Sequence, residues 1–286
     1  MPIRRAIVAG QFYPADPDEL RAEIAACGRA ALSFGSESTV GDAPVSEPGR
    51  RWAWDRPLLT LLPHAGHVFC GPVIAAALAG ARLPRRLVIL APSHTGRGHP
   101  LGFWPEGEWE TPLGNIPVDA ELGCELTALG GGFAPDTDPH VHEHDIEVLL
   151  PFLLGAQPDL TILPIVVGSP EGLSEAAHAL ASLVAAHADE LAFILSSDMH
   201  HYASDAENRR LDALALDAFL RLDPRRLLNV VQENRIGMCG ILPALMGLMA
   251  CRELGAAHAG LAAYDTSAAV SGDALRVVGY AGARVW

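Results

Sequence analysis

Histidines follow three separate apolar runs of this chain, in each case just after the run ends. The runs are LLTLLPHAG (58–66), LVILAPSHTG (87–96) and LAFILSSDMHHY (191–202). Short continuous hydrophobic stretches of this kind predict strands that are buried on both faces of a sheet. Because ligands bind outside the carboxyl ends of the strands in open parallel sheets, we expect the polar residues that follow the runs to form one functional site. These residues are His64, His94, Asp198, His200 and His201.

His64 and His94 are the best candidate metal ligands, because each follows its strand directly and has small neighbours that leave room for an ion. Two imidazoles with a third, anionic ligand are the common minimum for a redox-capable mononuclear metal. Three residues are candidates for the third ligand: Asp198, His201 and Cys239. A thiolate in this position would make the site softer than one built from two histidines and a carboxylate, and it would admit iron, copper or zinc.

Cys239 differs from the other four cysteines in its predicted surroundings. The five cysteines are odd in number, widely spaced and never in a C-x-x-C pair, which argues against a disulfide framework and a structural zinc knuckle. Residues 238–254 predict a helix that begins near Cys239, and a helix N-terminus lowers the pKa of a thiol toward the ligating thiolate. We expect all five thiols to be reduced, and Cys27, Cys70, Cys124 and Cys251 to pack as small hydrophobic residues.

The remaining histidines divide into candidates and packing residues. The segment 142–155 predicts a helix with His142 and His144 in its first turn, and their spacing of two means that only one of them can point into a site. His200 fits the site and the surface equally well. We assign the others to packing or to the solvated surface: His67, His99, His140, His178, His187 and His258.

The residue types present also exclude several kinds of catalysis. All 20 basic residues are arginine, so lysine Schiff bases, the P-loop lysine and lysine general bases are absent. Ser196 and Ser197 lie near histidines, but no G-x-S-x-G motif is present, which disfavours a serine hydrolase. Cys239 beside a histidine could act as a thiol nucleophile, and this is a second enzymatic hypothesis.

The predicted elements alternate in the way that is typical of an α/β protein. We expect one domain over residues 1–286, with a central, mostly parallel or mixed sheet flanked by helices. A helix is predicted after the turn in 9–32, capped by Asp16 or Asp18. Further helices are predicted at 71–83, 171–188 and 205–222, and further strands at 160–168, 261–268 and 274–286. A loop is predicted over 35–57, and a hairpin or lid over the site at 95–119.

Composition limits the partners and the location. Hydrophobic residues make up 50% of the 286 residues, yet no apolar run is long enough to span a membrane, and the N-terminus does not resemble a signal peptide. We therefore expect a cytoplasmic protein. The net charge of −14, without a basic cluster, argues against nucleic acid or an anionic membrane as partner and favours a small-molecule substrate or a protein partner.

Seven spaced motifs resemble those of the Memo family, whose microbial members are called AmmeMemoRadiSam system protein B. The resemblance extends over almost the whole chain, in the same order. The fold of this family is similar to that of class III extradiol dioxygenases, which are non-haem iron enzymes. The motifs are AGQFYP (9–14), PHAGHVFCG (63–71), APSHTG (91–96), TPLGNIPVD (111–119), EHDIEVLLPFL (143–153), SSDMHHY (196–202) and MCG (238–240).

The resemblance implies roles for particular residues. It makes His64 and His94 metal ligands and Cys239 the third ligand, and it places His144, Asp198 and His201 around the same pocket as acid/base or ligand-orienting groups. Fe(II) is the expected metal, with Cu or Zn as alternatives, for redox chemistry on a small substrate, aromatic compounds included. The family also implies association with a radical SAM protein and a third small protein of the same system, or, as an alternative function, non-catalytic recognition of a phosphopeptide or protein partner.

This chain departs from the family pattern at two places. The residue after the histidine of the E-H motif is usually serine in the family, and here it is Asp145. In the third histidine motif, Met199 and His200 replace the usual aromatic and small residues. These departures imply a pocket that is more polar or differently charged than usual.

Overall fold

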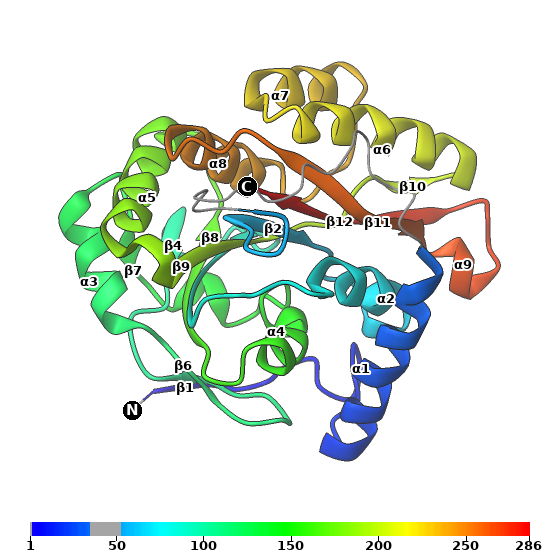
Figure 1. Ribbon diagram of the computed structural model, residues 1–286, viewed down its shortest axis with the longest axis horizontal. Helices are drawn as coiled ribbons and strands as arrows, with labels where there is room; N and C mark the ends of the chain where they lie inside the picture. The colour runs from blue at the N-terminus through cyan, green and yellow to red at the C-terminus, as the bar shows by residue number, and fades with distance from the viewer. Residues whose placement is uncertain (1, 35–52) are drawn as a thin grey trace.

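The computed structural model describes residues 2–34 and 53–286. These residues form an α/β domain in which helices cover both faces of a curled, nine-stranded mixed sheet (Figure 1). The predicted α/β class is therefore confirmed. Most of the loop that we predicted over 35–57 lies outside the described residues. No helix in the described ranges is both long and apolar enough to cross a membrane.

Four parallel strands form the centre of the sheet, in the order β2 (Leu59–Leu62), β9 (Leu191–Ser196), β3 (Arg86–Pro92) and β8 (Thr161–Val167). Their residues are apolar almost throughout because helices bury both faces. Leu62 pairs with Ser196 and Leu90 with Leu195, so the carboxyl ends of β2, β9 and β3 lie at the same edge. The three strands that we predicted to carry the site are thus direct neighbours.

The outer strands make the sheet mixed. The long strand β12 (Val277–Val285) is antiparallel to β2, and both β11 (Ala259–Thr266) and β10 (His201–Ala203) pair with β12. At the other end, β4 (Leu101–Phe103) is antiparallel to β8, and β7 (Ala134–Pro135) pairs with β4. The strands predicted at 160–168, 261–268 and 274–286 are confirmed.

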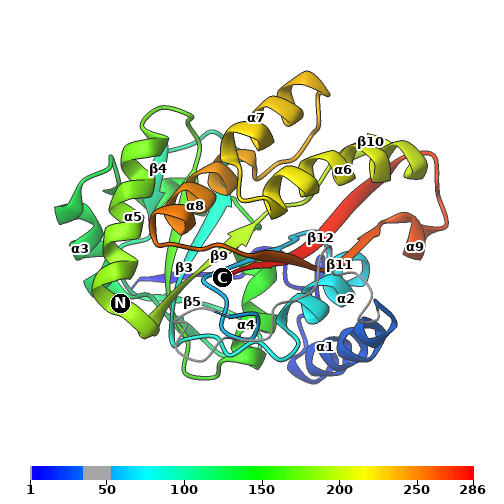
Figure 2. The same cartoon turned by 45° about the horizontal axis from the view of Figure 1, so that its top comes forward.

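Helices lie on the two sides of the sheet in two groups (Figure 2). One side carries α1 (Pro17–Ala31), α2 (His67–Leu78) and α4 (Leu150–Ala156). The other carries α5 (Leu173–His187), α6 (Asp205–Leu220), α7 (Pro224–Glu233) and α8 (Ile241–Glu253), with α3 (Ala120–Leu129) beside α5. A short helix, α9 (Ala268–Ser271), joins β11 to β12. The two largest apolar clusters fill the two spaces between sheet and helices.

The insertion at 95–119 contains the predicted hairpin. Its strands β5 (Glu108–Trp109) and β6 (Ile116–Pro117) are antiparallel neighbours. The N-terminal strand β1 (Ile3–Arg4) pairs with β5, so the insertion and the N-terminus form a separate three-stranded sheet. Short 3₁₀ helices complete the described elements at Leu32–Phe34, Asp138–His140, Glu147–Leu149 and Ala188–Glu190.

The predicted start of one helix was wrong. We expected a helix over 71–83 with its Gly-Pro pair in the first turn, but α2 begins at His67 and contains Pro72. The backbone N–H of His67 donates to the carbonyl of Phe12 at 2.8 Å. A contact with the N-terminal segment therefore satisfies a donor at the helix start, and the local sequence alone does not reveal this contact.

The helix predicted over 142–155 is also shorter than expected. A 3₁₀ helix at Glu147–Leu149 leads into α4, and residues 142–145 form the turn before it. The side chain of Glu143 accepts hydrogen bonds from the backbone of the loop after β3. These tertiary contacts hold the turn in a conformation that does not continue the helix.

Candidate metal centre

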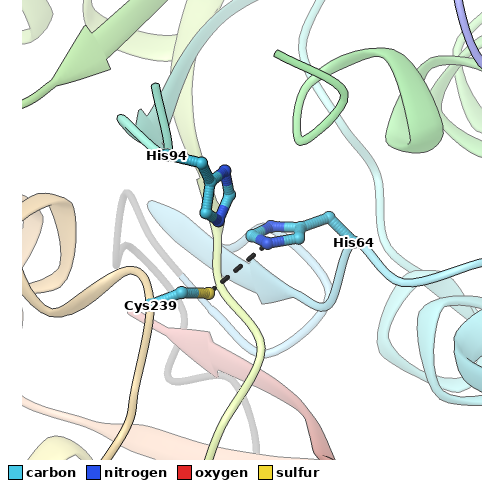
Figure 3. Close-up of side chains that lie close together, drawn as sticks. All are labelled: His64, His94 and Cys239. Carbon is cyan, nitrogen blue, oxygen red and sulfur yellow. Dashed lines mark hydrogen bonds between the residues drawn. The ribbon is translucent and has the colours of Figure 1, made fainter. Parts of the chain in front are cut away.

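His64, His94 and Cys239 come together at the carboxyl edge of the sheet (Figure 3). His64 follows β2, His94 follows β3, and Cys239 lies in the loop before α8. Their potential ligand atoms all lie within 4.8 Å of one another, and His64 Nε2 is 3.4 Å from Cys239 Sγ. The structure therefore brings these three side chains close together, as we expected from the sequence.

The ring of His64 is oriented by a serine at the end of β9. Its Nδ1 lies 2.7 Å from Ser196 Oγ, and that hydroxyl donates its proton to the carbonyl of Asp145 at 2.8 Å. A serine has one hydroxyl proton, so Ser196 must accept the second bond from the Nδ1–H of His64. The lone pair of His64 is then on Nε2, which faces Cys239.

The ring of His94 is oriented by Glu143. His94 Nδ1–H donates to Glu143 Oε2 at 2.8 Å, and Glu143 Oε1 accepts the backbone N–H groups of His94 and Thr95 at 2.6 and 2.8 Å. The Glu143 side chain is only 2% exposed. Hydrogen bonds to Cys239 and to Glu143 raise the pKa of His94 to about 10, against the opposing effect of burial. His94 thus has its Nε2 free for a ligand when the ring is neutral.

The thiol of Cys239 is partly buried and accepts a backbone hydrogen bond. The N–H of Asp198 donates to Cys239 Sγ at 3.1 Å. Burial raises the pKa of the thiol, and the hydrogen bond to His94 only partly opposes this effect. Our expectation of a lowered pKa was wrong: α8 begins at Ile241, after the thiol, and burial raises the pKa of Cys239 instead.

Gly240 allows the Cys239 loop to approach the sheet. A Cβ atom at position 240 would lie 2.4 Å from Ser197 Cβ and 2.7 Å from the carbonyl oxygen of Ser196, which is closer than atoms can pack. The Gly240 N–H donates to Ser197 Oγ at 2.9 Å. The absence of a side chain at 240 therefore lets the loop place Cys239 against the end of β9.

Asp198 is in the site but does not orient an imidazole as we predicted. Its Oδ1 accepts the backbone N–H of His64 at 2.8 Å. The carboxyl is buried, and this burial raises its pKa to about 6. Asp198 thus fixes the backbone that carries His64, while Ser196 contacts the ring.

His144 lies beside the two strand-end histidines, and His201 lies farther away. The ring centroid of His144 is 5.6 Å from that of His64 and 5.4 Å from that of His94. Phe12 packs edge-on against His144, with the centroids 4.8 Å apart. His201 Nδ1–H donates to the carbonyl of Gly237 at 2.6 Å, and the potential metal-binding groups of the described residues do not include it.

Three other histidines lie at the surface or are packed in the interior, outside the group of potential metal ligands. His142 is exposed, so His144 is the one of this pair that faces the site. His200 Nδ1 accepts the N–H of Gly237 at 2.7 Å. His67 is buried between Glu23 and the carbonyl of Val148, which agrees with its assignment to packing.

Sequence reasoning missed four residues that shape the site: Phe12, Glu143, Asp145 and Ser196. Glu143 lies 49 positions after its partner His94, and no local pattern relates the two. Ser196 was noted only as a serine, although its position at a strand end was a usable signal. Asp145 was noted only as a departure from the family pattern.

The three donors fit a transition metal of intermediate softness. Two neutral imidazoles and a thiolate are ligands typical of Zn²⁺, iron and copper sites. Each imidazole has its other nitrogen held by a hydrogen-bond acceptor, as is usual for ligating histidines. The side chain of His94 is 35% exposed, so water or a small molecule can approach the centre.

Comparisons with known proteins agree with the motif resemblance. A family model described as "Memo-like protein" matches residues 4–284. A MEMO1 family protein of Methanopyrus kandleri is 34% identical over 286 residues, which covers 97% of each chain. Similar proteins of Desulfurococcus amylolyticus and Thermotoga maritima are 36% and 35% identical, again with 97% of each chain covered.

Proposed function

Because the chain belongs to the Memo-like family and groups two imidazoles with a thiol, we propose that it binds one transition metal through His64, His94 and Cys239. The observation that carries this proposal is the orientation of both rings. Ser196 and Glu143 hold the Nδ1 atoms, and the Nε2 atoms remain for a ligand. Fe(II) is the metal we favour, with Cu and Zn as alternatives for this mixed donor set.

We further propose that the centre is catalytic and acts on a small molecule. A bound metal would supply Lewis acidity or one-electron redox chemistry. His144 lies within reach of both ligating histidines and carries no charge near neutral pH, because burial lowers its pKa. A neutral imidazole in this position can take up or hold a proton at its ring nitrogen during a reaction. The association with a radical SAM protein and a third small protein stays a prediction of the family resemblance.

A thiol nucleophile is the second candidate function, and one observation favours it. Cys239 Sγ lies 3.4 Å from His64 Nε2 and within 4.8 Å of a ring nitrogen of His94, whose Nδ1 bonds to Glu143, and a thiol beside an imidazole that a carboxylate orients is the arrangement that activates catalytic cysteines. Recognition of a phosphopeptide is less well supported. Phosphate recognition favours arginine clusters, and the nearby Arg97 is already paired with Asp138 at 2.8 Å.

Alkylation of Cys239 in the presence and absence of metal separates the first two functions. If Cys239 is a ligand, stoichiometric Fe(II) or Zn²⁺ should protect it from iodoacetamide, as mapped by mass spectrometry, and a chelator should restore the reaction. Cys124 is exposed and not packed as we expected, whereas Cys27, Cys70 and Cys251 are buried. Cys124 therefore serves as an internal control, since metal should not change its alkylation. Equal alkylation of Cys239 with and without metal would contradict the proposed metal centre and favour the nucleophile.

A further inference from the structure

Two consecutive histidines hold the loop that carries Cys239. Gly237 lies in this loop, two residues before the thiol, and is exposed. The N–H of Gly237 donates to His200 Nδ1 at 2.7 Å, and the carbonyl of Gly237 accepts the Nδ1–H of His201 at 2.6 Å. Both backbone groups of one loop residue are therefore bonded to side chains at the start of β10.

The two imidazoles take opposite roles in these hydrogen bonds. Because His200 accepts through Nδ1, its ring proton is on Nε2, whereas His201 carries a proton on Nδ1 and donates it. Burial lowers the pKa of His200, so the ring is neutral near pH 7 and keeps the lone pair that accepts the bond. One acceptor and one donor thus match the N–H and the carbonyl of Gly237.

The backbone of His200 is itself fixed to the core of the domain. Its N–H donates to Asp212 Oδ1 in α6 at 2.8 Å, and its carbonyl accepts the N–H of Gly279 in β12 at 3.0 Å. Asp212 is buried, and its Oδ2 accepts the hydroxyl of Tyr264 at 2.6 Å and the amide of Asn208 at 2.9 Å. His200 therefore joins a rigid part of the fold to the loop.

We propose that His200 is a positioning residue, which holds the Cys239 thiol at the candidate metal centre through its bond to Gly237. The thiol is then fixed from two directions, since the N–H of Asp198 donates to Sγ and His200 holds the backbone two residues away. Without the imidazole, the N–H of Gly237 would lose its acceptor and the loop would move more freely. The inference rests on the proposed function only for the use of this thiol as a ligand.

The rate of alkylation of Cys239 in the metal-free protein tests the positioning without any metal. Iodoacetamide reacts with a partly buried thiol faster when its loop opens, so His200→Ala should raise the rate about fivefold, as expected for the loss of one hydrogen bond. His200→Asn should restore the wild-type rate, because the amide oxygen of asparagine can take the place of Nδ1 as acceptor. The exposed Cys124 should react at the same rate in every variant.

His258→Ala is the matched control. His258 lies beside Trp286, where β11 and β12 reach the start of β2, at the opposite edge of the sheet from the candidate metal centre. Its removal should change neither the alkylation of Cys239 nor metal binding. Circular dichroism checks that each variant is folded, and His200→Ser provides the same comparison if alanine impairs folding.

Co²⁺ reports on the metal centre separately, since a thiolate ligand gives this ion a charge-transfer absorption. In wild type the absorption should be present, and in His200→Ala it should be weaker, with Co²⁺ bound about fivefold less tightly. His200→Asn should again behave as wild type. This absorption reports on the bond from the thiolate to the ion, which a loss of overall stability alone would not change.

The two measurements distinguish failure of this inference from failure of the proposed function. If His200→Ala matches wild type in both, the inference is overturned, and the absorption in wild type leaves the proposed function intact. Alkylation as fast in His200→Asn as in His200→Ala would also overturn the inference, since the acceptor would not be the cause. If wild type shows no absorption while alkylation depends on His200, the positioning role stands and the proposed function fails.

Discussion

At the scale of single residues, the hydrogen bonds to Nδ1 decide which nitrogen of each histidine is available to a metal. For His64 the acceptor is Ser196, whose own proton is committed to the carbonyl of Asp145. Ser196→Ala should therefore leave the ring free to rotate and change tautomer, and we expect metal affinity to fall by roughly 10–100-fold. Competition with a metal-binding dye measures this.

The matched control for this prediction is Ser271→Ala, which removes an exposed serine hydroxyl that donates to the carbonyl of Ser267 and accepts the N–H of Asp273, far from any ligand histidine. Its metal affinity should equal that of wild type. Wild-type affinity in Ser196→Ala would show that the hydroxyl does not orient His64.

Protons compete with a metal at two of the three ligands. The pKa of His94 is raised to about 10, and burial raises the pKa of Cys239, so both hold a proton at neutral pH. Burial lowers the pKa of His64, which is therefore neutral and does not compete. Metal affinity should rise with pH, by about tenfold per pH unit for each proton displaced. Titrations between about pH 6 and pH 9 that gave the same affinity would contradict this protonation scheme.

The residues that the sequence could identify are those next to the ends of predicted strands and helices. His64 and His94 could be grouped because apolar runs precede them, and Cys239 because a helix follows it. The partners of these ligands could not be identified. Glu143, which bonds to His94, lies in a turn that we predicted to be helical. Asp198 accepts the backbone N–H of His64, and a contact with the backbone cannot be recognised from a pattern of residue types.

At the scale of elements, the close packing of the loop before α8 against β9 positions the thiol. Gly240→Ala would place a methyl group within 2.4 Å of Ser197 Cβ, so the loop must move away and take Cys239 with it. We expect this variant to lose metal affinity by at least about tenfold while the remaining core stays folded. Isothermal titration and circular dichroism measure the two effects.

Gly155→Ala is the control, since position 155 lies in α4 and a Cβ atom there meets no other atom within 4 Å. It should bind metal as wild type. Unchanged affinity in Gly240→Ala would show that the approach of this loop does not determine the position of the thiol.

The strands of this fold were easier to predict than the ends of its helices. The runs that form β2, β3, β8 and β9 are apolar because both of their faces are buried. A continuous apolar run can be recognised from the local sequence alone. The start of α2 depends on a carbonyl in the N-terminal segment, and the start of α4 depends on contacts of Glu143. Such long-range contacts leave no periodic signal.

At the scale of the whole molecule, the N-terminal segment is tied to the turn that carries Glu143. The fully buried carboxylate of Glu147 bonds to the guanidinium of Arg4, to the N–H groups of Ile7 and Val8, and to the hydroxyl of Tyr13. Glu147→Gln leaves the buried guanidinium without its counterion, and the free energy of unfolding should fall by about 3–5 kcal/mol. Urea denaturation measures this loss.

Arg21→Gln breaks an ion pair of Asp18 on the exposed face of α1 and serves as the control. Its effect on the free energy of unfolding should be much smaller. If the two variants were equally stable, the N-terminal segment would not be held by Glu147 in the way that the structure indicates.

The central claim is that this fold brings His64, His94 and Cys239 together to bind a metal. Metal analysis of protein purified without oxygen and reconstituted with Fe(II) tests it most directly, with wild type compared to His64→Ala, His94→Ala and Cys239→Ala. Wild type should retain about one tightly held iron per chain, and each variant should lose it while keeping its circular dichroism spectrum. Iron content that is unchanged in all three variants would contradict the claim.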